Sequence, residues 1–289
     1  MNFFKVLLLA IRPKTLTASI CPVLMGTAMA LKAGYFDLLT FLFTLLTALG
    51  IQIGTNLAND YFDFKKGADT SARIGPVRVT QAGLISGAAM KKLIVINFVL
   101  VALTGSFLIW KGGLVFSLLI AFAILFAIFY TAGPYSIAYL GLGELFVLIF
   151  FGPVAVGGVY YLQAHEFSFQ SSLAGLSCGL ISSVILMVNN IRDIEEDRKA
   201  NKKTLAVRFG SRFGKRLFAF FIILPAFLPL AFSARHPFVL LASLTLFPSL
   251  FLIKEVMRNQ DPPLFNPILG KTSKLLLVYT LIFCFSWMV

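Results

Sequence analysis

The sequence predicts an all-α, polytopic membrane protein with about nine transmembrane helices in one bundle. Of its 289 residues, 58% are hydrophobic, and the mean hydropathy is +0.89. A soluble domain is typically only about 45–50% apolar. The apolar runs are too long for barrel strands, and a helix satisfies its own backbone hydrogen bonds within lipid. We expect residues 1–289 to form a single transmembrane domain.

Nine runs are apolar over close to the roughly 20 residues that a membrane-spanning helix requires. They are Leu16–Leu31, Leu38–Leu57, Leu93–Trp110, Leu114–Ala132, Leu145–Leu162, Leu173–Ile191, Leu217–Ala234, Phe238–Ile253 and Leu275–Met288. No small-residue cleavage site precedes Arg12, so we expect the first span to be retained and not removed as a signal. The three cysteines, Cys21, Cys178 and Cys284, lie in apolar runs without metal-ligand spacing and are expected in the core.

The distribution of Lys and Arg predicts which helix ends face the cytoplasm. With a cytoplasmic N-terminus, all but three of the 25 basic residues fall on the cytoplasmic side, the exceptions being Lys32, Lys111 and Arg235. We therefore expect a multi-pass protein of the cell membrane with two long cytoplasmic capping loops, at about 59–91 and 192–216. Because the net charge of +13 follows this topology, a nucleic-acid partner is not expected.

The second span ends in a cluster of amides and carboxylates. The cluster contains Asn56, Asn59, Asp60, Asp63 and Asp69. If the helix continues through it, Asn56 with Asp60 and Asn59 with Asp63 are two i, i+4 pairs, each projecting from one helical stripe. A solvated polar loop is the ordinary explanation. However, a carboxylate at the end of a membrane span is energetically expensive and usually functional.

A second cluster of the same form, NNIRDIEED, follows the sixth span and places Asp193 and Asp197 four residues apart. Oxygen ligands without His or Cys suit Mg²⁺, which commonly bridges one or two carboxylates to substrate phosphates. Basic residues of the same two loops supply countercharge for phosphate oxygens. They are Lys65, Lys66, Arg73, Arg78, Arg192, Arg198, Lys202, Lys203 and Arg208. The positive-inside rule could place any one of them, but their interleaving with carboxylates predicts a metal-diphosphate site at the cytoplasmic rim.

These motifs resemble the UbiA superfamily of intramembrane aromatic prenyltransferases. The stretches that carry the resemblance are RPKTL (12–16), NLANDYFDFKKGAD (56–69), RIGPVRVTQAGLI (73–85), GLGELFVLIFFGPVAVGGVYYLQ (141–163), NNIRDIEEDRKANKKTLAVRFG (189–210) and NPILGKTSKLLL (266–277). The similarity covers essentially the whole chain and is greatest to the branch that prenylates 1,4-dihydroxy-2-naphthoate in menaquinone biosynthesis. The chain departs from the superfamily at Gly67, where a further Asp is usual, and Asp69 lies two residues beyond.

The resemblance implies transfer of a polyprenyl chain from polyprenyl diphosphate to 1,4-dihydroxy-2-naphthoate, with loss of pyrophosphate and CO₂ to give demethylmenaquinone. It implies Mg²⁺ as cofactor and the lipid bilayer as surroundings for the isoprenoid tail. The implied metal ligands are Asn59, Asp60, Asp63, Asp69, Asp193 and Asp197. The implied catalytic residues are Asp63, Asp193, Asp197, Arg78 and Lys203, and the implied substrate contacts are Asn56, Arg12, Arg73, Tyr61, Tyr130, Arg192 and Lys202. Of these contacts, Arg12 or Arg73 is expected to pair with the carboxylate of the acceptor.

Two alternatives remain open from the sequence. The acceptor could be another aromatic, such as 4-hydroxybenzoate or homogentisate. The chain could instead be a transporter, although a transporter is expected to carry its charges near the bilayer midplane and these clusters lie at one rim. A cytidine-diphosphate alcohol phosphotransferase is excluded because the Asp-Gly-x-x-Ala-Arg signature does not occur.

Overall fold

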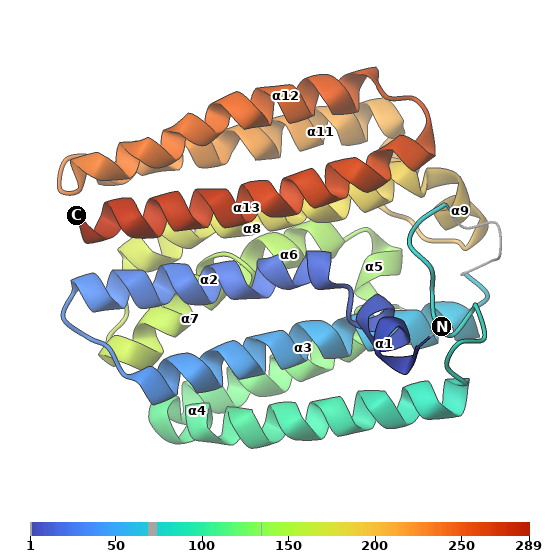
Figure 1. The fold of residues 1–289 in the computed structure, drawn as a ribbon, viewed down its shortest axis with the longest axis horizontal. Coiled ribbons are helices and arrows are strands. Elements are labelled where there is room, and N and C mark those ends of the chain that lie inside the picture. The colour runs from blue at the N-terminus through green and yellow to red at the C-terminus, as the bar shows by residue number, and fades with distance from the viewer. Residues whose placement is uncertain (1, 69–73, 134) are drawn as a thin grey trace.

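The computed structural model describes residues 2–68, 74–133 and 135–289, and every regular element among them is a helix. The helices lie alongside one another in a bundle (Figure 1). The elements are α1 Phe3–Ile11, α2 Pro13–Lys32, α3 Leu38–Lys65, α4 Gly87–Phe129, α5 Ile137–Leu140, α6 Gly143–Phe150, α7 Pro153–Ala164, α8 Phe169–Arg192, α9 Ile194–Lys199, α10 Leu205–Phe209, α11 Ser211–Ile223, η1 Leu224–Ala226, η2 Leu228–Phe232, η3 Pro237–Thr245, α12 Leu246–Arg258, η4 Pro262–Leu264 and α13 Phe265–Met288. This architecture confirms the predicted all-α membrane bundle.

The helix α4 accounts for two crossings of the membrane. Eight helical stretches in the described part of the chain are long and apolar enough to span a bilayer, and α4 is one of them, with 43 residues. At 1.5 Å per residue it would be about 65 Å long, twice the roughly 30 Å hydrocarbon core. Gly113 breaks it, with φ 65° and ψ −151°, and the chain reverses direction there (Figure 1). The two arms correspond to the predicted third and fourth spans, so the described residues cross nine times.

The helix α3 continues eight residues beyond its predicted end at Leu57 and finishes at Lys65. The first acidic cluster therefore lies on a helix, as the i, i+4 interpretation requires, and Asn56, Asp60 and Asp63 are all buried. The second motif begins at the end of α8, which extends to Arg192. Both motifs lie at the same end of the bundle, together with α1, α5 and α9, whereas the C-terminus lies at the opposite end (Figure 1). We refer to the end that carries the motifs as the charged end.

The span predicted at 145–162 is two helices in the structure, α6 and α7. The chain bends at Gly152, and this bend packs directly on α8. Gly179 of α8 lies against the backbone carbonyl oxygen of Leu148, and the Cα of Gly152 would be 3.0 Å from a Cβ at Gly179. A side chain at Gly179 would push the two elements apart, so glycine fixes the distance between α6 and α8. That distance matters because both helices contribute polar side chains to one cavity.

Candidate functional site

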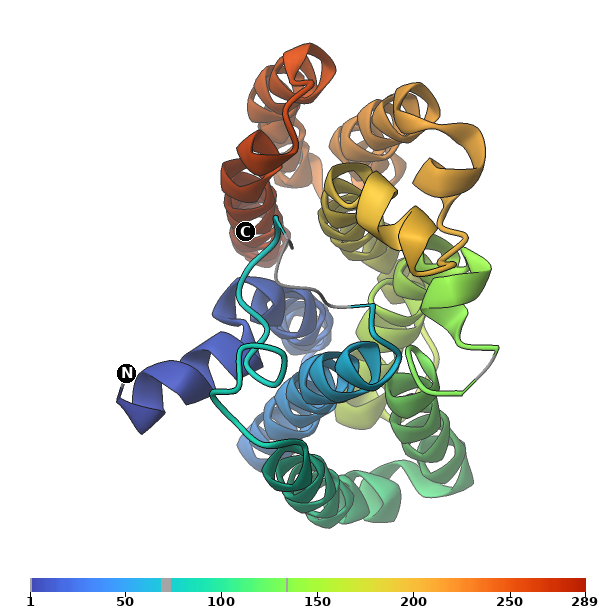
Figure 2. The ribbon, with the colours of Figure 1, turned by 90° about the vertical axis from the view of Figure 1, so that its right-hand side faces the viewer.

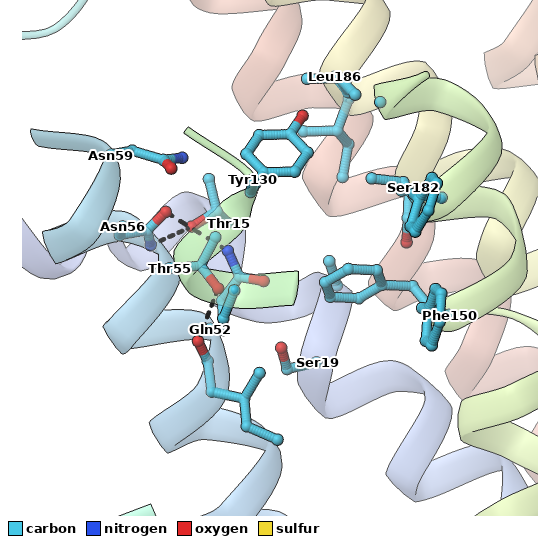
Figure 3. A pocket seen from close by; sticks show the side chains of 18 of the residues that line it. Thr15, Ser19, Gln52, Thr55, Asn56, Asn59, Tyr130, Phe150, Ser182 and Leu186 are labelled. Atoms are coloured by element: carbon cyan, nitrogen blue, oxygen red, sulfur yellow. Dashed lines mark hydrogen bonds between the residues drawn. The ribbon is translucent and has the colours of Figure 1, made fainter. Parts of the chain in front are cut away.

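A cavity of about 630 Å³ lies within the bundle and is polar at the charged end. Farther from that end, apolar side chains of α4, α6 and α7 line it, including Phe116, Phe126, Phe150 and Leu162. Figure 3 shows Asn56 and Asn59 of α3 on one side of the pocket, with Tyr130, Phe150 and Ser182 across from them. The shape suits a ligand with a charged head and a long apolar tail.

The α3 wall is joined to the α1–α2 corner through Asn56. The Asn56 Nδ2 donates to the Ile11 carbonyl oxygen at 2.7 Å and to the Thr15 Oγ1 at 2.9 Å. The corner forms because Pro13 starts α2, and Arg12 before it adopts a left-handed conformation with φ 56°. Arg12 consequently lies at the cavity mouth, where its Nη2 is 3.9 Å from the Asp60 Oδ2.

Asp63 contacts three side chains at the mouth, and only 2% of it is exposed. The Tyr139 hydroxyl donates to its Oδ1 at 3.1 Å. Its Oδ2 is 3.4 Å from the Arg78 Nη2 and 3.2 Å from the Lys202 Nζ. The Lys202 Nζ is also 3.8 Å from the Asp197 Oδ1. The two motifs, more than 100 residues apart in sequence, thus share one cation at one mouth.

Asp193 forms the other wall of the mouth with its neighbour Arg192. The guanidinium donates from Nε to the Asp193 Oδ1 at 2.6 Å and from Nη2 to Oδ2 at 2.7 Å. Its third nitrogen, Nη1, donates to the Asn266 Oδ1 at 2.8 Å. Such a bidentate pair is geometrically well defined. Both Arg192 and Asp193 line the cavity.

Tyr139 belongs to the site although the sequence did not point to it. Besides its bond to Asp63, its ring lies 3.9 Å from the Lys66 Nζ, which donates to the Thr131 carbonyl oxygen at 2.6 Å. Burial lowers the pKa of Lys66, the charge of Asp63 partly opposes this, and Lys202 lowers it further. Thr131 in turn donates from Oγ1 to the Asn59 Oδ1 at 2.7 Å, which orients that predicted ligand.

Residues 74–86, which precede α4, cross the charged end (Figure 2) and are attached at three points. The Asp60 carboxylate accepts the backbone N–H groups of Val79 and Thr80 at 3.1 and 2.9 Å. The Ile74 N–H donates to the Glu196 Oε1 at 2.9 Å, and its carbonyl accepts from the Asn266 Nδ2 at 3.2 Å. The loop therefore caps the cavity, as the sequence predicted.

We expect Asp60→Ala to release this cap. Val79 and Thr80 are almost fully buried, and each N–H would lose its partner, at about 1–3 kcal/mol per unsatisfied group. Hydrogen exchange measured by mass spectrometry should show lost protection over residues 74–86, with a smaller loss for Asp60→Asn, which keeps one acceptor oxygen. Unchanged exchange in both variants would contradict the anchoring role.

Three predicted site residues, Asp60, Lys203 and Tyr61, do not line the cavity. Asp60 does not line the cavity, and its bonds to the cap favour an anchoring role over the predicted metal-ligand role. Lys203 is exposed and is not among the residues that line the cavity, whereas its neighbour Lys202 is. Tyr61 packs in a separate apolar cluster with Val6, Leu57 and Met90 instead of contacting the cavity. Asp69 and Arg73 lie outside the described residues.

The remaining carboxylates fit a divalent cation that is shared with a ligand. In the described part of the chain, no group of three or more His, Cys, Asp or Glu side chains lies close enough together to bind a metal ion by itself. Asn59, Asp63, Asp193 and Asp197 nevertheless all line one mouth, and each would bind a metal ion through a side-chain oxygen. A hard cation held by one or two carboxylates per ion, and completed by phosphate oxygens, matches this donor set.

Comparison with known proteins gives concordant results. The sequence model of the UbiA prenyltransferase family matches residues 19–264. The chain is 38% identical to the 1,4-dihydroxy-2-naphthoate octaprenyltransferase of Escherichia coli (strain K12), over 95% of this chain and 92% of that protein. It is 31% identical to UbiA prenyltransferase domain-containing protein 1 of Xenopus tropicalis, over 96% of this chain and 80% of that one. Among solved structures, a UbiA homolog from Archaeoglobus fulgidus bound to DMAPP and Mg²⁺ shares the fold, with a TM-score of 0.65, 16% identity and coverage of 96% and 98% of the two chains.

Proposed function

Because the chain belongs to the UbiA prenyltransferase family, we propose that it transfers a polyprenyl chain from polyprenyl diphosphate to 1,4-dihydroxy-2-naphthoate, releasing pyrophosphate and CO₂ and forming demethylmenaquinol, the reduced form of demethylmenaquinone. One observation supports prenyl transfer as the reaction class: Lys202 contacts both Asp63 and Asp197 at the mouth of an apolar cavity. The name of the Escherichia coli relative supports the acceptor.

The charged mouth accounts for binding of the diphosphate. Arg78, Arg192 and Lys202 line it and supply donors for phosphate oxygens. Asn59, Asp63, Asp193 and Asp197 would hold Mg²⁺, which supplies positive charge that stabilises the departing pyrophosphate. Tyr139, Arg78 and Lys202 hold the Asp63 carboxylate in place, so the mouth needs little rearrangement when the substrate arrives.

The apolar part of the cavity accounts for the tail and for protection of the allylic cation. Aromatic side chains such as Phe126, Phe150 and Tyr130 line it and can stabilise positive charge through their ring faces. Exclusion of water prevents hydrolysis of the reactive intermediate. The cap anchored by Asp60 covers the charged end and would help to keep water out.

The carboxylate of the acceptor requires a cation that the diphosphate does not use. Arg12 lines the mouth and its side chain is 21% exposed, so it can meet an incoming anion. We propose that Arg12 binds the carboxylate of the naphthoate. The charged end would face the cytoplasm, with the N-terminus on the same side, because nearly all basic residues fall there.

The identity of the acceptor can be tested by measuring product formation by purified protein in lipid nanodiscs with one labelled polyprenyl diphosphate. Separate reactions supply 1,4-dihydroxy-2-naphthoate, 4-hydroxybenzoate and homogentisate. We expect prenylated product with CO₂ release for the naphthoate alone, loss of product when EDTA removes Mg²⁺, and recovery when Mg²⁺ is restored. Product from another acceptor but none from the naphthoate would overturn the proposed acceptor, and EDTA-resistant product would overturn the metal requirement.

A further inference from the structure

A buried carboxylate lies in the cavity apart from the diphosphate mouth. Glu144, in the first turn of α6, lines the cavity and is only 5% exposed. Its Oε1 accepts a hydrogen bond from the Asn190 Nδ2 at 2.8 Å. Its Oε2 is buried and has no hydrogen-bond partner among the described residues. A buried oxygen without a partner is energetically unfavourable, so its presence beside a ligand cavity points to a hydrogen bond that the ligand completes.

The packing of α6 on α8 fixes the position of Glu144. The Ser183 Oγ donates to the backbone carbonyl of Glu144 at 3.0 Å, and Gly179 holds the next turn of α8 against Leu148. Tyr130 also approaches the start of α6, since a Cβ at Gly143 would lie 2.9 Å from its hydroxyl oxygen. Glu144 is therefore a side chain on a rigid support, which suits a group that acts on a bound substrate.

The depth of Glu144 matches the place of reaction. Its partner Asn190 precedes Asp193 by three residues on α8, which is about 4.5 Å along the helix axis toward the apolar part. The diphosphate is expected beside Asp193, so the allylic carbon attached to it would lie at the level of Asn190 and Glu144. Leu186, one turn farther along α8, lies beside the Tyr130 ring (Figure 3), and both residues line the cavity.

We propose that the Glu144 Oε2 binds the C1 hydroxyl of the aromatic acceptor, next to the ring carbon that carries the carboxylate, and takes its proton during transfer, an inference that rests on the proposed function. The O–H bond breaks and its electron pair enters the ring. The ring carbon that carries the carboxylate then bonds to the allylic carbon, while the allylic C–O bond breaks and its pair leaves with pyrophosphate. Loss of CO₂ leaves its bonding pair on the ring, and the proton returns from Glu144 to the oxygen.

The charge of Glu144 would also orient the acceptor. Glu144 would repel the carboxylate of the naphthoate, so we expect the ring to bind with its C1 hydroxyl toward Glu144 and the adjacent carboxylate turned toward a cation such as Arg12. An aromatic without a correctly placed hydroxyl would leave the Glu144 Oε2 unsatisfied. Discrimination against such compounds is expected to be large, because sites built to bond a substrate hydroxyl strongly reject analogues that lack it.

The variant Glu144→Gln tests this role, because the amide keeps the size of the side chain but cannot take a proton. We expect kcat with 1,4-dihydroxy-2-naphthoate to fall about 100-fold, a typical contribution of a general base. Binding of polyprenyl diphosphate, measured by calorimetry, should stay within twofold of the native value. The matched control is Glu166→Gln, an exposed residue at the opposite end of the bundle, which should behave as native. Native kcat in Glu144→Gln would overturn the proposal, while an inactive native protein would refute the proposed function instead.

Acceptor analogues give a second test that does not require turnover. We would measure inhibition by 1-hydroxy-2-naphthoate and by 4-hydroxy-2-naphthoate, each lacking one hydroxyl. 1-Hydroxy-2-naphthoate keeps the contacting hydroxyl and should bind native protein at least about 10-fold more tightly than Glu144→Gln, whereas 4-hydroxy-2-naphthoate should bind both proteins equally. Should neither analogue distinguish the two proteins, Glu144 does not contact a hydroxyl. If Glu144→Gln fails to fold, Glu144→Asp replaces it, with a shortened carboxylate and an expected intermediate loss.

Discussion

Asp63→Asn is expected to lower the rate of pyrophosphate release by about three orders of magnitude or more. The substitution keeps the size of the side chain but removes the charge that faces Arg78 and Lys202 at 3.4 and 3.2 Å. It also removes a proposed metal ligand and leaves the largely buried side chains of Arg78 and Lys202 without the negative charge between them. Loss of one preorganised electrostatic group commonly costs about 10²–10³ in kcat, and loss of a metal ligand adds to this.

The measurement is Mg²⁺-dependent release of pyrophosphate by purified protein, with thermal unfolding recorded in parallel. Asp193→Asn should give a comparable loss, because Asp193 lines the opposite wall of the mouth. The matched control is Asp261→Asn, an exposed carboxylate in the turn between α12 and η4. Activity of Asp63→Asn within threefold of native would remove this residue from the mechanism.

The sequence predicted the acidic side chains of the site because they lie on helices. A helix converts a spacing of four residues into a shared face, so Asn59 and Asp63 could be paired without knowing the fold. The positive-inside rule then placed both motifs on one side of the membrane. The contact of Lys202 with Asp63 shows that the two motifs do lie at one mouth.

The sequence could not predict the side chains that reach the mouth from a short helix or through distant packing. Tyr139 lies on the four-residue helix α5, and no helical period relates it to Asp63 on α3. Glu144 is a single charged residue in an otherwise apolar run, so it has no polar neighbour at helical spacing in that run. Its partner Asn190 is 46 residues away. The anchoring role of Asp60 depends on the path of the cap, which spacing within α3 does not reveal.

The fold was predicted more completely, because hydropathy reports which residues lie in lipid. Hydropathy does not report where a backbone bends within the membrane. The break at Gly152 and the 3₁₀ segments from Leu224 to Thr245 were therefore missed, although the spans themselves were found. The short helix α1 was missed for a different reason, since nine residues are too few to register as a span.

The adjacent lysines Lys202 and Lys203 provide the sharpest contrast between the sequence interpretation and the structure. The Lys202 side chain is 12% exposed and lies between Asp63 and Asp197, with its Nζ 5.1 Å from the centre of the Tyr139 ring. Lys203 is exposed, and its backbone N–H donates to the Tyr139 carbonyl oxygen at 2.9 Å. The sequence assigned catalysis to Lys203, whereas the geometry favours Lys202.

We expect Lys202→Met to lower kcat about 100-fold, because it removes a buried cation that contacts both motifs and would stabilise negative charge on the departing pyrophosphate. Lys203→Met should stay within about threefold of native, since its contact to Tyr139 is made by the backbone and survives the substitution. Steady-state kinetics of both variants with the same polyprenyl diphosphate measures the difference. A larger loss in Lys203→Met than in Lys202→Met would restore the sequence assignment. It would also mean that the loop after α9 changes conformation during catalysis, so that Lys203 enters the mouth in place of Lys202.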